Sequence, residues 1–78
     1  MHTMVYLLEI EATKRVYRLF TTLSKELEAE YPEVRYGAGN TLRFSRDQAR
    51  MMFNQPGDKI DLFNGERPVG KITVVQLR

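Results

Sequence analysis

The chain has 78 residues, of which 42% are hydrophobic and 28% are charged, and its formal net charge is +2. This composition is too apolar for a disordered chain and predicts one small globular domain spanning residues 1–78. The chain contains no cysteine, which excludes disulfides, thiolate nucleophiles, iron–sulfur clusters and cysteine zinc sites. A sequence pI near 9.2 mildly favours anionic partners.

The most apolar run, Met4 to Leu8, is far shorter than the ~20 residues that a membrane-spanning helix needs. The start of the chain also lacks the basic leader and the small-residue cleavage site of a signal peptide. We therefore expect a soluble, cytoplasmic protein with no membrane partner. Residues 1–3 are expected to be frayed.

The first predicted element is a strand from Met4 to Glu11, which has apolar residues on both faces and is expected at the centre of a sheet, covered on both sides. A long helix is expected next, with Thr13 as its N-cap. The helix should end near Tyr31, because Pro32 disfavours helical geometry in the residue before it. Apolar residues with helical spacing support it at Val16, Leu19, Phe20, Leu23 and Leu27.

Two short strands are expected around the turn at residues 37–40, one from Val34 to Tyr36 and one from Thr41 to Phe44. Ser45 and Gln48 have the spacing of a capping box and predict the start of a second, short helix. That helix should end at residues 54–57, where asparagine, proline and glycine follow its last apolar residues.

A hairpin is expected at the end of the chain, with one strand from Lys59 to Phe63 and a turn at residues 64–65. The final strand is expected around Lys71 to Leu77. Pro68 and Gly70 make the connection between these strands irregular, so the sequence leaves their pairing register open.

In chain order these elements read β-α-β-β-α-β with one further strand. Over residues 4–63 this order resembles the ferredoxin-like arrangement, which implies an antiparallel sheet with two helices on one face. We therefore expect a small α+β domain. In a competing architecture the last hairpin forms a small layer of its own. The resemblance concerns topology alone and implies no function.

Basic residues gather along the first predicted helix, ahead of its glutamates, although the helix dipole favours the opposite order. Most of them would lie together beside its buried face, and the second helix would extend the group. Such a positive surface suits phosphate, carboxylate or an acidic protein surface. The alternative is a set of solvated side chains that pair with nearby glutamates. We define this basic flank as Lys14, Arg15, Arg18, Lys25, Arg46 and Arg50.

Three further residues are secondary candidates. Arg35 and Arg43 flank the turn at residues 37–40, whose glycines would allow backbone amides to form an anion nest, although ordinary turn chemistry explains the same glycines and is favoured. Met51 begins a run of three apolar residues that a helix cannot bury on one narrow face. An exposed Met51 would suit a protein interface, and a deeply sunk helix is the alternative.

Aromatic residues on the predicted strands offer a possible surface for stacking bases, as in RNA-recognition motifs. Tyr6, Tyr36 and Phe44 lie on suitable strands. The stretch from Tyr36 to Phe44 nevertheless lacks the aromatic spacing of that motif. We therefore expect Phe44 to pack in the core.

Catalytic and metal-binding residues are scarce. The only histidine is His2, so a histidine triad or metal cluster has no second member. The carboxylates of Asp58, Asp61 and Glu66 match no calcium loop, and Asp58 is better explained as a turn residue. We expect no enzyme activity, no cofactor and no metal site.

These observations favour a non-enzymatic module that docks nucleic acid or a nucleoprotein through the basic flank. The alternative is a small protein–protein inhibitor or adaptor of the kind that phages and plasmids use to block a host enzyme. A homodimer is a third possibility, since open sheet edges invite pairing.

Overall fold

The computed structural model describes residues 4–18 and 20–77. Expectations for residues 1–3, including His2, and for Leu19 lie outside these ranges. The chain forms β1 (Met4–Ile10), β2 (Thr13–Tyr17), α1 (Phe20–Glu30), β3 (Arg35–Tyr36), β4 (Asn40–Thr41), α2 (Arg46–Met52), β5 (Lys59–Asn64) and β6 (Arg67–Leu77).

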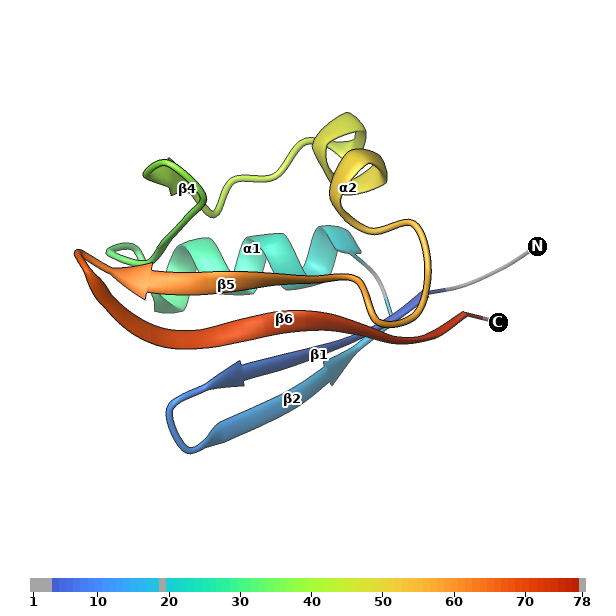
Figure 1. Cartoon of the computed structure of the whole chain (residues 1–78), viewed down its shortest axis with the longest axis horizontal. Helices are drawn as coiled ribbons and strands as arrows, with labels where there is room; N and C mark the ends of the chain where they lie inside the picture. The colour runs from blue at the N-terminus through green and yellow to red at the C-terminus, as the bar shows by residue number, and fades with distance from the viewer. Residues whose placement is uncertain (1–3, 19, 78) are drawn as a thin grey trace.

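The six strands of the described chain form one antiparallel sheet in the order β2-β1-β6-β5-β3-β4. In Figure 1 the β1–β2 hairpin lies on one side of this sheet and β4 on the other. The α+β class, the two helices and the antiparallel sheet are confirmed. The ferredoxin-like order is not confirmed, because the chain runs ββαββαββ. The last hairpin, β5–β6, lies inside the sheet and does not form a separate layer.

The predicted helix start at Thr13 is wrong, because residues 13–17 form β2. A turn through Glu11, whose φ is 53°, folds β2 back on β1 and brings Tyr17 opposite Tyr6. The β-branched and aromatic residues of this segment fit an edge strand as well as they fit a helix, and pairing with β1 satisfies its backbone groups. The basic flank is therefore not one face of a helix, since its first two members lie on β2.

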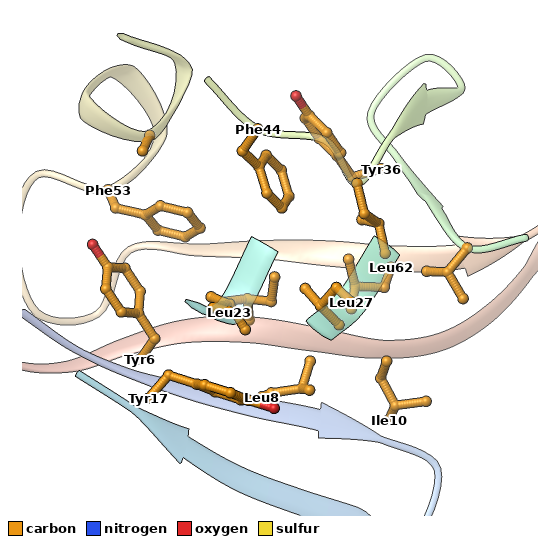
Figure 2. Close-up of a cluster of buried hydrophobic side chains, with 14 of the residues drawn as sticks. Tyr6, Leu8, Ile10, Tyr17, Leu23, Leu27, Tyr36, Phe44, Phe53 and Leu62 are labelled. Atoms are coloured by element: carbon orange, nitrogen blue, oxygen red, sulfur yellow. The ribbon is translucent and has the colours of Figure 1, made fainter. Parts of the chain in front are cut away.

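Both helices cover the same face of the sheet. Figure 2 shows Tyr6, Leu8 and Ile10 of β1 pointing toward Leu23 and Leu27 of α1. These five side chains are buried, and Leu23 and Leu27 are fully so. The helix ends at Glu30, next to the predicted position. Burial of this apolar face, rather than helix propensity, is the main source of stability for a helix of this length.

The other face of the sheet carries no helix of the described chain, so the prediction that β1 is covered on both sides is wrong. The strand registers align a row of four charged residues of alternating sign across this face. Only the first pair approaches closely, with Lys14 Nζ 3.9 Å from Glu9 Oε2. Cross-strand pairs of opposite charge stabilise a sheet modestly. The charge row consists of Lys14, Glu9, Lys71 and Asp61.

The later elements agree with the sequence more closely. The capping box at the start of α2 is present in both directions between Ser45 and Gln48. β3 and β4 are shorter than predicted, with two residues each. The final strand begins at Arg67, earlier than expected, and the pairing register shifts between Leu62 and Phe63.

Candidate binding groove

The structure separates the members of the basic flank. On β2, Arg15 donates hydrogen bonds through Nη1 to Glu30 Oε1 at 2.7 Å and to Glu26 Oε2 at 3.4 Å. The bond to Glu30 is the main cause that raises the pKa of Arg15 above its usual value. Lys14 belongs to the charge row on the opposite face of the sheet. Arg18 is exposed in the bend before α1. Arg15 therefore fastens β2 to α1.

The remaining three members of the basic flank line one groove between α1 and α2. Its cavity has a volume of about 910 Å³, which lies within the range of small-molecule and peptide sites. Each helix contributes residues spaced i, i+3, i+4 and i+7, the positions that share one helix face. From α1 these are Thr21, Ser24, Lys25 and Glu28, and from α2 and its C-cap they are Arg46, Ala49, Arg50 and Phe53.

The floor of the groove is aromatic. The ring of Phe20 is half-buried and lies at the centre of a ring cluster, with centroid distances of 5.3 Å to Phe44, 5.5 Å to Tyr6 and 5.9 Å to Phe53. Figure 2 shows Tyr6, Phe44 and Phe53 converging on the helix side of the sheet. Burial raises the pKa of Tyr6, so its hydroxyl is neutral near pH 7. The rings supply an uncharged, apolar surface.

Three exposed cations stand above this floor: Lys25 on α1, and Arg46 and Arg50 on α2. Within the described residues none of them forms an ion pair. Arg46 and Arg50 are one helical turn apart, so both guanidinium groups are carried by the same face of α2. The alternative of solvated side chains paired with nearby glutamates would place Glu28 beside Lys25, and no such pair occurs among the described residues.

Two carboxylates also line the groove, but each is engaged by a donor from outside it. Glu26 accepts a hydrogen bond from the Tyr17 hydroxyl at 2.7 Å, in addition to the bond from Arg15. Glu28 Oε1 accepts from Nη2 of Arg43 at 2.9 Å and from its Nε at 3.2 Å, which raises the pKa of Arg43. Three cations and two carboxylates therefore line the groove, and its net charge is positive. Glu28 pairs with Arg43, while Glu26 shares Arg15 with Glu30.

The walls of the groove are tied together by Ser24, a residue that the sequence did not single out. Its buried hydroxyl donates to the carbonyl of Leu42 and accepts from the amide of Phe44, both at 3.2 Å. These bonds hold the segment before α2 against α1. The sequence signal that could have identified Ser24 is its position beside Leu23 on the buried side of the helix, since a buried hydroxyl requires hydrogen-bond partners.

The secondary candidates serve local structure or remain exposed. Arg35 donates to the carbonyls of Pro32 and Val34, and Arg43 holds Glu28. Tyr36 and Phe44 are buried, so the prediction of a core role for Phe44 is confirmed. Met51 is 80% exposed, as one of the two sequence interpretations requires.

No group of three potential metal ligands occurs in the described chain. Asp58 instead accepts hydrogen bonds from the amides of Asn54 and Gln55 at 2.7 and 3.1 Å, which is the turn role predicted for it. Neither described helix has the length and apolar character that crossing a membrane requires.

Comparisons of the chain with protein-family models, with curated proteins and with solved structures find no match. The fold and the site define a small α+β protein with an aromatic-floored, positively charged groove between its helices. Its function is therefore inferred from that groove.

Proposed function

We propose that the chain is a non-enzymatic binding module that docks an anionic partner, nucleic acid or a nucleoprotein, in the groove between α1 and α2. The supporting observation is that the acidic side chains of the groove have partners from outside it, whereas its basic side chains form no ion pair with the described residues. Lys25, Arg46 and Arg50 form no ion pair with the described residues, while both lining carboxylates are engaged by other side chains. A concave surface with an excess of one sign of charge concentrates ligands of the opposite charge.

The proposed site is narrower than the basic flank. Lys14 and Arg15 are paired within the fold and lie outside the groove. Arg18 is exposed but does not line the groove, and we keep it as a peripheral contact. The three groove cations are the residues that would contact phosphate.

Binding to a fluorescent oligonucleotide across a series of salt concentrations tests this proposal. If three phosphates are neutralised, the logarithm of the binding constant should fall with the logarithm of salt concentration with a slope of about −2 for a single strand. In the double variant with Arg46→Ala and Arg50→Ala, the slope should be shallower than about −1. Absence of binding at low salt would exclude nucleic acid as the partner.

Arg67→Ala is the matched control for a lost positive charge. Arg67 begins β6, at the end of the sheet away from Met4, and pairs with Glu11 at 3.1 Å. Its substitution should leave both the affinity and the salt slope close to those of the unmodified protein. An equal loss from Arg67→Ala and Arg50→Ala would show that net charge, and not the groove, governs binding.

A second candidate function is a small protein–protein inhibitor or adaptor. The observation that favours it is Met51, which is 80% exposed and lies next to Arg50 on α2. Exposed methionine suits adaptable protein interfaces. A partner captured from nuclease-treated lysate by the unmodified protein, and lost with Met51→Gln, would support this function over the first.

A further inference from the structure

The apolar lining of the groove is mostly aromatic. Its apolar residues are Met4, Tyr6, Phe20, Phe44, Ala49 and Phe53. Flat rings pack favourably against the faces and edges of other flat rings. Phe20 and Met4 are only half-buried, so part of their surface is open to a ligand. Tyr6, Phe44 and Phe53 are buried, so Phe20 is the ring of the floor that a planar group can reach.

Positive charge is carried by both walls above this floor. Lys25 stands on α1, and Arg46 and Arg50 stand on the facing stripe of α2. Residues at i and i+4 of a helix have Cβ atoms about 5–6 Å apart, a separation of the same order as that between neighbouring phosphates of an extended strand. A ligand with a repeating anion and planar side groups matches both features.

A nucleic-acid duplex matches the groove less well. Its bases are stacked inside, and its convex outer surface presents phosphate and sugar, so it would reach the rim and leave the aromatic floor unfilled. Arg46 and Arg50 share their helix face with buried Ala49 and Phe53. α2 therefore cannot insert this face into a major groove unless Ala49 and Phe53 leave the core.

From these features we infer that the groove binds a single strand of nucleic acid, with phosphates on Lys25, Arg46 and Arg50 and bases against the Phe20 side of the aromatic floor. This inference rests on the proposed function and narrows its partner. Proteins that bind single strands without sequence preference combine the same two elements, a positive groove and aromatic surfaces.

The test compares four labelled or competing ligands of equal length by fluorescence anisotropy at low salt: a single strand, the matching duplex, an abasic single strand and polyglutamate. The single strand should bind at least tenfold more tightly than the other three. Equal affinity for the normal and abasic strands would overturn the inference while leaving anion binding intact. Tighter binding of the duplex or of polyglutamate would also overturn it. No binding to any ligand would remove the proposed function as well.

Phe20→Leu provides a second measurement on the protein side, because leucine keeps an apolar group while removing the ring. The variant should lose at least threefold in affinity for the normal strand and keep its affinity for the abasic strand. Circular dichroism and thermal unfolding establish that the variant is folded. If it is not folded, the comparison of normal with abasic strand on the unmodified protein still decides the question.

Discussion

Tyr17 shows how one side chain can connect two elements that the sequence predicts to be one. Its ring is buried opposite Tyr6, and its hydroxyl donates to Glu26 of α1. Burial, followed by the hydrogen bond to Glu26, raises the pKa of Tyr17 above its usual 10.0. The neutral phenol is therefore the form that the folded protein favours.

Because the folded-state pKa is the higher one, the stabilisation due to Tyr17 is complete below pH 10.0 and is lost as the pH rises through the folded value. We expect the free energy of unfolding to fall in alkali, and to fall less steeply for Tyr17→Phe. Urea unfolding of both proteins from about pH 8 to 11 measures this difference. Parallel pH profiles would contradict it. Tyr6, whose pKa is also raised, is present in both proteins.

Between elements, the contact of α1 with the segment before α2 sets the charge of the groove. Arg43 lies outside the groove and holds the carboxylate of Glu28, which lines it. Arg43→Ala should therefore weaken oligonucleotide binding more than Arg67→Ala, although both variants lose one positive charge. Anisotropy titrations of the two variants at one low salt concentration make the comparison.

Both substitutions remove exposed ion pairs, which contribute little to stability, so thermal unfolding should change little. Equal affinities for the two variants would show that the Glu28 charge is not felt in the groove. Arg43→Lys keeps the positive charge, but its single ammonium group replaces the contact made by two guanidinium nitrogens. This variant should therefore bind more tightly than Arg43→Ala and less tightly than the unmodified protein.

Among the helices and strands, the sequence predicted those whose signals lie within a few neighbouring residues. The capping box needs only Ser45 and Gln48, and the hairpin β5–β6 needs only its turn and alternating strands. The segment from Thr13 to Tyr17 carried two compatible patterns, one helical and one extended. The extended pattern is the one observed, because the backbone groups along the edge of β1 require hydrogen-bond partners. A short stretch of sequence does not reveal this requirement.

For the whole molecule, the sheet depends on the close approach of β1 and β6 at Gly70. A Cβ atom at this position would collide with the backbone carbonyl of Glu9. Gly70→Ala should therefore destabilise the fold by more than about 3 kcal/mol or prevent folding, as expected when two paired strands are forced apart. Chemical unfolding monitored by circular dichroism measures the loss.

Gly39→Ala is the control for this prediction. Gly39 has φ 91°, so alanine is strained there, but its exposed turn has open space around it. Its cost should be clearly smaller than that of Gly70→Ala. A cost for Gly70→Ala equal to or below that of Gly39→Ala would show that β1 and β6 adjust without difficulty.

The groove could be predicted only in part, because it joins residues that are distant in the chain. The sequence identified Lys25, Arg46 and Arg50 as candidate contacts, and the structure brings these three together. It did not indicate which of the other basic residues are paired, since the pairs of Arg15 and Arg43 span 15 residues each. Pairing at that separation follows from tertiary structure and not from local pattern.

The charge row across the helix-free face has a consequence for encounter with a large anion. Lys14, Glu9, Lys71 and Asp61 alternate in sign and sum to zero, so their fields cancel within a short distance of that surface. The three like charges above the aromatic floor reinforce one another instead. The row therefore contributes little to the attraction of a polyanion, and binding at the groove would depend on the cations of the groove itself.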